Sequence, residues 1–422
     1  MIAMTSIFIY IVIIIIQPQE FIPFFQGMPV SDIIIPLALG IGLLETWSKK
    51  RRIWLPQHTL LLCFLIFVFL SNALNGNMAA GSDQGILYLK RVAVYFMVFF
   101  ALSSPDRIKT TSWSLILVVA ILAIEGIDHA RSGTGWAGEP FAEGRIRWIG
   151  NWDGSNGLAL LFIIATTLSL EFCLGPYARG SGRILAAIAL TVLLPGIYLT
   201  GSRGGWLSLC LVVFLFFIER YRKYAMRVVV MMLLMAGLLF SFAPARMGEV
   251  NTKEASARER LWSWEQGIRF LQTHPLYGIG KGQFGPSTPD GLIAHNNYVQ
   301  ISAEIGWIGF FIWLAIPYLS LKGCYLIYRQ AVTTWEQALL VSLARALLTT
   351  LIGFSAATFF ITMELDILFV LWGLCSALIV EGLRRFPTLS FSLTWRDGSI
   401  VLGGGTAMIA LVYVIAVIEP FR

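Results

Sequence analysis

Residues 58–74 read HTLLLCFLIFVFLSNAL, a nearly continuous apolar run without a charged side chain. As an α-helix, a run of this length reaches across the hydrocarbon core of a bilayer. Similar runs recur along the whole chain and are separated by short polar breaks. Continuous apolar runs are typical of spanning helices, because a membrane barrel strand alternates apolar and polar residues.

The composition excludes a soluble protein. Hydrophobic residues make up 57% and charged residues 13% of the 422 residues, and the mean hydropathy is +0.74. A soluble domain of this size needs more polar surface. Much of the net charge of +7 sits in short loops, where it indicates membrane topology rather than nucleic-acid binding. We therefore predict an all-α polytopic membrane protein with one integral membrane domain over residues 1–422.

Twelve spans are expected, and a thirteenth if the last apolar run also crosses. The N-terminal run lacks a basic segment and a cleavage site, so it is predicted to be a retained first span rather than a signal peptide. The predicted spans lie near residues 2–16, 32–47, 58–74, 86–103, 112–128, 156–173, 184–200, 204–219, 226–243, 298–320, 338–360, 365–382 and 399–418.

Clusters of Lys and Arg follow the even-numbered spans, whereas the loops after spans one, three and eleven have none. The positive-inside rule therefore predicts a cytoplasmic N-terminus and places the loops after odd-numbered spans outside. Residues 244–297 then form a large outer loop between spans nine and ten.

Several cations break this rule on the outer side. Each could be an interfacial side chain or a partner of a nearby glutamate, but their coincidence on one side favours a basic outer cavity that binds an anion. Two of these cations lie within span four, where a charge is costly unless it faces a wet or anionic cavity. The residues are Lys90, Arg91, Arg131, Arg145, Arg147, Arg203, Arg246, Lys253, Arg258, Arg260, Arg269 and Lys281.

Two segments carry the expected phosphate chemistry. In TGSRGGW, glycines flank Arg203, so backbone N–H groups at a helix N-terminus can approach a phosphate closely; the alternative is an ordinary tight turn. Residues 251–271 predict an amphipathic helix with Leu261, Ile268 and Leu271 on one face, seated at the membrane interface by its tryptophans. That helix places Arg258 at the mouth of the cavity.

His295 in AHNNYVQ has the richest polar setting of the four histidines. With an ordinary pKa of about 6.5 it is suited to act as a general base; the alternative is a histidine that caps a helix or contacts a headgroup. The glycine-rich HPLYGIGKGQFG is not a nucleotide-binding loop, because no strand precedes it and its lysine is not followed by Ser or Thr. No acidic or histidine cluster in an outer loop calls for a metal ion or cofactor.

The ordered motifs GRIRWIGNWDGSNG, TGSRGGW, HPLYGIGKGQF, AHNNYVQ and EIGWIG, together with Arg258 and Trp262 in R-x3-W, resemble the bacterial O-antigen ligase and O-antigen polymerase superfamily. The resemblance implies a twelve-span helical core, distantly similar to C-type glycosyltransferases, in the inner membrane with its active site facing the periplasm. A ligase of this kind acts in lipopolysaccharide biosynthesis, moving a glycan from undecaprenyl pyrophosphate to lipid A–core oligosaccharide without a metal.

The resemblance also implies roles for particular residues. His295 matches the candidate base, and Arg203 and Arg258 match arginines on the pyrophosphate. Further candidates for substrate binding are Arg91, Arg145, Arg147, Arg260, Asn297 and Tyr298.

Two alternatives to a ligase stay open. A repeat-unit polymerase uses the same donor and passes the glycan to another lipid-linked repeat; the single long outer loop favours the ligase. A lipid or glycan transporter belongs to another class and needs essential charges near the membrane centre. The cations placed inside the membrane are Arg345 in span eleven and Lys90 and Arg91 in the outer third of span four, so transport is disfavoured.

Overall fold

The computed structural model of the protein describes residues 2–48, 54–176, 178–224, 226, 230 and 255–418, and within these ranges it contains helices and no β-strand. Apart from residues 226 and 230, the predicted span 226–243 lies outside the described residues, as do the cations Arg246 and Lys253. The α-helices are α1 (Ile2–Ile16), α2 (Pro18–Phe21), α3 (Val30–Ser48), α4 (Pro56–Leu74), α5 (Met78–Ala101), α6 (Pro105–Ser132), α7 (Ser155–Leu174), α8 (Gly180–Leu199), α9 (Arg203–Arg220), α12 (Ala255–Thr273), α13 (Asn297–Tyr328), α14 (Trp335–Ala357), α15 (Asp366–Arg385) and α16 (Trp395–Tyr413).

The helices confirm an all-α polytopic membrane protein. Within the described part of the chain, nine helices are long and apolar enough to cross a membrane: α4 to α8 and α13 to α16. Helices α1 and α9 are shorter and apolar, and α3 coincides with the predicted second span. The total of twelve or thirteen spans stays a prediction.

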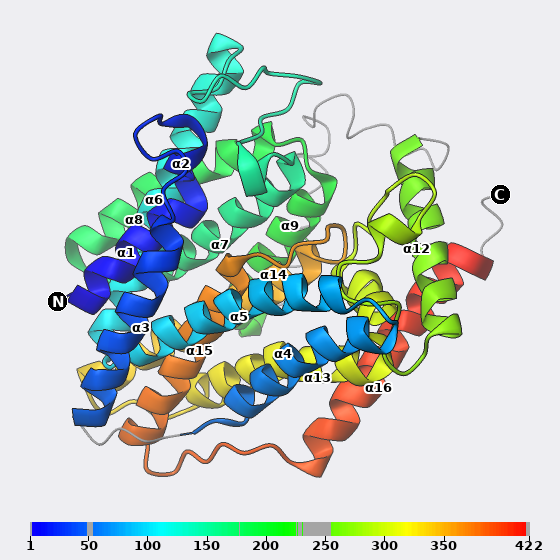
Figure 1. Cartoon of the computed structure of the whole chain (residues 1–422). Coiled ribbons are helices and arrows are strands. Elements are labelled where there is room, and N and C mark those ends of the chain that lie inside the picture. Colours follow the sequence, from blue (N-terminus) through cyan, green and yellow to red (C-terminus); the bar gives the residue numbers. More distant parts are fainter. Residues whose placement is uncertain are drawn as a thin grey trace.

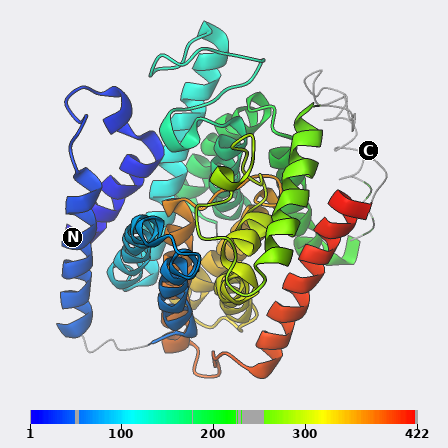
Figure 2. The same cartoon turned by 45° about the vertical axis from the view of Figure 1, so that its right-hand side comes forward.

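The bundle surrounds three enclosed helices. Helices α7, α14 and α15 are buried along almost their whole length, as expected for apolar helices that other helices cover on all sides. Figure 1 shows α1 and α3 at one side of the bundle and α12 and α16 at the other, and Figure 2 shows the same order after rotation.

The loops that follow odd-numbered spans meet at one end of the bundle. Their hydrogen bonds include Ile146 N–H to Leu199 O (3.1 Å), Asn75 Nδ2 to Gly278 O (2.9 Å), Asn151 N–H to Gln17 Oε1 (3.3 Å) and Asn297 N–H to Thr358 O (2.9 Å). At the other end, Gln337 Nε2 donates to Arg385 O at 2.8 Å. The alternation read from loop charge is therefore consistent with the fold, and which end faces the periplasm stays a prediction.

Two cations within the predicted spans, Arg345 and Lys90, are paired with carboxylates. Arg345 of α14 donates from Nε to Glu171 Oε2 of α7 at 2.6 Å, and both residues are buried. Lys90 Nζ lies 2.6 Å from a carboxylate oxygen of Asp32. An ionised side chain in a low-dielectric setting is costly unless it is paired. We therefore assign these charges to contacts between helices.

Helix α13 is kinked at Gly306, where φ is 64° and ψ is −174°. The loop before the helix packs into this kink: Trp307 N–H donates to Pro275 O at 2.8 Å, and Gly280 N–H donates to Glu304 O at 2.9 Å. A Cβ on Gly306 would lie 2.5 Å from the backbone of Leu276. The glycine in EIGWIG therefore allows HPLYGIG to dock, and the predicted uninterrupted span 298–320 is in fact two segments of unequal length.

Replacing Gly306 with alanine is expected to lower the free energy of unfolding by about 1–3 kcal/mol, because alanine disfavours this backbone conformation and its methyl group meets the docked loop. Thermal unfolding in detergent measures the effect. Gly403→Ala is the matched control, since a Cβ there meets nothing within 4 Å. Equal melting temperatures for the two variants would contradict the structural need for glycine at the kink.

Candidate active site

A cavity of about 60 Å³ lies at the loop-rich end of the bundle. Its arginines come from three separate parts of the chain: the α6–α7 loop, the start of α9 and the start of α12. Three guanidinium groups around so small a space produce a positive potential that attracts an anion. The lining residues are Arg145, Asn156, Gly201, Ser202, Arg203, Gly204, Gly205, Arg260, Ala357, Phe360 and Ile361.

The N-terminus of α9 forms one wall of this cavity. Ser202 is the N-cap, and its side-chain oxygen accepts the N–H of Gly205 at 3.1 Å. The first N–H groups of a helix have no partner within it, and this end of the helix is positive. Gly204 is needed for close packing, because a Cβ there would lie 2.9 Å from Phe360. The turn and helix start predicted from TGSRGGW are confirmed.

Arg145 is held by the same turn. Its Nε donates to Thr200 O at 2.8 Å, and a terminal nitrogen donates to Asn156 Oδ1 at 3.2 Å. Ser202 Oγ donates to the same Asn156 oxygen at 2.7 Å. Asn156 therefore connects Arg145 to the cap of α9. Sequence reasoning did not single out Asn156, although it lies in the quoted motif NWDGSNG.

His295 is half-buried and adopts a left-handed backbone conformation with φ of 49°. A non-glycine residue is uncommon there and needs support from its surroundings. The neighbouring Asn296 is the N-cap of α13, with its side chain accepting the N–H groups of Tyr298 and Val299. Because Asn296 fills the capping role, the structure does not support the alternative of a helix-capping histidine.

Burial lowers the pKa of His295 below its ordinary value, the positive charge of Arg260 lowers it further, and Glu259 opposes the change. The imidazole is therefore neutral at pH 7 and can accept a proton.

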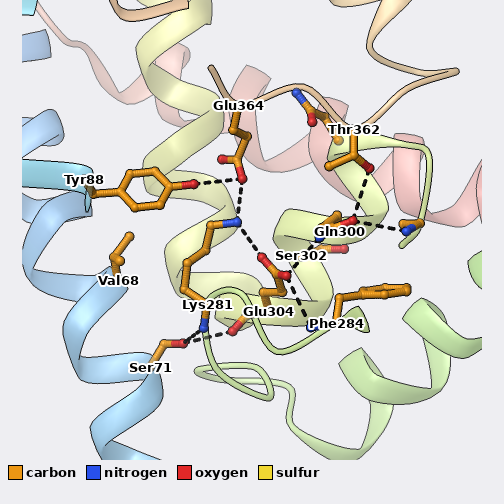
Figure 3. A network of polar contacts seen from close by, with 12 residues as sticks. Val68, Ser71, Tyr88, Lys281, Phe284, Gln300, Ser302, Glu304, Thr362 and Glu364 are labelled. Carbon is orange, nitrogen blue, oxygen red and sulfur yellow. Dashed lines mark hydrogen bonds and ion pairs between the residues drawn. The ribbon is translucent and has the colours of Figure 1, made fainter. Parts of the chain in front are cut away.

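A buried polar network connects Lys281 with Glu304 and Glu364 (Figure 3). Lys281 forms ion pairs with Glu304 and Glu364, and Tyr88 Oη donates to Glu364 at 2.9 Å. Burial alone lowers the pKa of Lys281, but the two carboxylates outweigh burial and hold it well above its ordinary value. The expectation that Lys281 belongs to the basic cavity was wrong, because its charge is neutralised inside the protein.

Helix α12 confirms the predicted amphipathic helix, with Trp264, Ile268 and Leu271 buried. The expectation that its tryptophans seat it at the membrane interface was wrong for Trp264, which packs inward and donates from Nε1 to Ala294 O at 2.9 Å. Arg258 at the start of α12 is exposed and lies outside the cavity lining, whereas Arg260 lines it. A role for Arg258 stays a prediction.

The remaining candidates for substrate binding lie outside this lining. Asn297 exchanges two hydrogen bonds with the backbone of Met363, and Tyr298 Oη donates to Ser355 O at 3.0 Å. Arg91 Nε is 3.5 Å from Asp366 Oδ1, and Arg147 is half-buried. Their contact with substrate stays a prediction, and the first three already have structural partners.

Within the described ranges, no three His, Cys, Asp or Glu side chains are grouped as a metal site would require. The polar groups that line this cavity are arginines, the Asn156 amide and the Ser202 hydroxyl, and arginines suit an anion.

The described fold and cavity define a polytopic membrane protein with an arginine-lined site at one end of its helical bundle. Residues 185–314, a segment that contains Arg203, Arg260 and His295, match the family described as O-antigen ligase. Its members are glycosyltransferase-like enzymes, and the family implies lipid-linked glycan substrates. Residues 2–144 match a family of unknown function (DUF5935). No curated protein matches the chain.

Proposed function

We propose that the protein is an O-antigen ligase that transfers a glycan from undecaprenyl pyrophosphate to lipid A–core oligosaccharide at the periplasmic face of the inner membrane. The observation that supports this most strongly is the meeting of Arg145, Arg203 and Arg260 around one cavity. The residue after His295 is hydrogen-bonded to Thr362, which directly follows the cavity-lining Ile361.

The proposed chemistry follows from these groups. Pyrophosphate is a good leaving group, and arginine forks neutralise its growing charge through paired hydrogen bonds to oxygen. Fixed cations and the start of α9 stabilise that charge without rearrangement. Neutral His295 takes the proton of the acceptor hydroxyl as its oxygen attacks the anomeric carbon. The carbon–pyrophosphate bond breaks in the same displacement, which inverts that carbon.

A transfer assay with purified protein tests the proposal. The donor is a glycan on undecaprenyl pyrophosphate, EDTA is present throughout, and the acceptor is either lipid A–core or a second lipid-linked repeat. Product on lipid A–core supports the ligase, and a ladder on the lipid carrier indicates the polymerase instead. Absence of both products would overturn glycan transfer and favour a transporter.

The pH dependence of transfer is expected to report on His295. The base acts in its neutral form, so kcat falls as pH drops through its pKa, which lies below the ordinary value of 6.5. Arg260→Gln removes a positive charge, which raises this pKa and moves the acid limb of the kcat profile to higher pH. An acid limb at the same pH in the variant would argue against His295 as the titrating base.

A further inference from the structure

The backbone N–H groups of the residues before and after His295 are bound by one pair of side chains. Ala294 N–H donates to Gln300 Oε1 at 3.1 Å, and Asn296 N–H donates to the Thr362 hydroxyl at 3.2 Å. The same hydroxyl donates to Gln300 Oε1 at 3.1 Å, a contact that Figure 3 shows. The Gln300–Thr362 pair therefore holds the backbone before and after the strained residue.

The orientation of the Gln300 amide is fixed from behind. Its Nε2 donates to Glu304 Oε1 at 3.0 Å, one turn further along α13. Glu304 is fully buried and forms an ion pair with Lys281. If the amide turned over, its NH₂ group would face the N–H of Ala294, donor against donor. The buried ion pair thus keeps the Gln300 oxygen directed at the backbone beside His295.

Thr362 links His295 to the wall of the arginine-lined cavity. The preceding residues Phe360 and Ile361 line that cavity. The N–H and the C=O of the following Met363 are both hydrogen-bonded to the side-chain amide of Asn297. A segment fixed in this way sets the separation between the His295 backbone and the cavity.

We propose that Gln300 and Thr362 are positioning residues for His295 in the glycan transfer proposed above, on which this inference rests. The pair maintains the left-handed conformation of His295 and fixes its backbone relative to Ile361 in the cavity wall. Neither side chain needs to touch the substrate. Their loss is expected to misplace the base while leaving the arginines where they are.

The test compares Thr362→Val, which removes the hydroxyl at nearly constant volume, with Thr362→Ser, which keeps it. Thr388→Val is the matched control, because Thr388 is exposed and its hydroxyl contacts Gln330, away from the cavity. We expect kcat of Thr362→Val to fall about ten- to hundredfold, as for a small misplacement of a reacting group. KM for the lipid-linked donor should change little, and Thr362→Ser should recover most of kcat.

A second readout does not depend on transfer. Diethylpyrocarbonate modifies neutral imidazole, and mass spectrometry measures its rate at His295. That rate should rise in Thr362→Val and in Gln300→Met, and it should not change in Thr362→Ser or Thr388→Val. Two disrupting variants are used so that the test remains possible if one of them fails to fold. Unchanged labelling in folded Thr362→Val and Gln300→Met would overturn the proposal. Faster labelling with no transfer by the wild-type protein would support the positioning role and refute the proposed function.

Discussion

Replacing His295 is expected to remove nearly all transfer activity while the protein still folds and inserts. A positioned general base contributes about 10²- to 10⁴-fold to a rate, so kcat of His295→Ala should fall by that amount. Alanine is strained at φ of 49°, whereas asparagine tolerates left-handed backbone better. His295→Asn is therefore the more informative variant, because it removes the base and preserves the local fold.

The comparison requires that both variants be folded. Melting temperature and elution volume in detergent should match the wild-type protein for His295→Asn. The histidine control is His274→Asn, because His274 lies at the end of α12 and contacts Thr273; it should retain activity. Wild-type rates in a folded His295→Asn variant would remove His295 from the reaction.

The second large effect is expected at Arg203, where lysine keeps the charge but loses the planar fork. A hydrogen bond to a charged group is worth about 1.5–3 kcal/mol, so losing one of a pair should lower kcat about ten- to hundredfold. Steady-state transfer kinetics measure this loss. Arg269→Lys on α12 is the control, since Arg269 is 61% exposed and pairs with Glu265. Full activity in Arg203→Lys would contradict two-pronged phosphate binding.

The sequence predicted the fold well where the length and polarity of a segment alone determine its structure. Apolar runs give the helix positions closely, as α7 (Ser155–Leu174) shows against its prediction of 156–173. The kink at Gly306 was not predictable, because it depends on a loop about thirty residues earlier that docks against it. Local patterns do not contain such tertiary contacts.

The site was predictable in part for a related reason. Arg203 and His295 stand in distinctive motifs and lie at or beside the cavity. Arg258 and Arg260 are two residues apart on one helix, a rotation of about 200° about the helix axis, so they point to nearly opposite sides. The motif alone does not say which of them faces inward. Lys281 looked like an available cation because one of its partners, Glu364, is 83 residues away. Only the fold shows that this charge is neutralised.

The buried pair of Arg345 with Glu171 has a consequence for biogenesis. The two residues are separated by 174 positions, which a ribosome covers in about 9 to 35 s at ordinary rates of synthesis. During that interval the pair of Glu171 with Arg345 cannot form, and a charge in a membrane helix is costly without its partner. The ion pair therefore forms only after α14 has been synthesised. The enclosed centre of the bundle is consequently completed late, because α7 and α14 are synthesised at well-separated times.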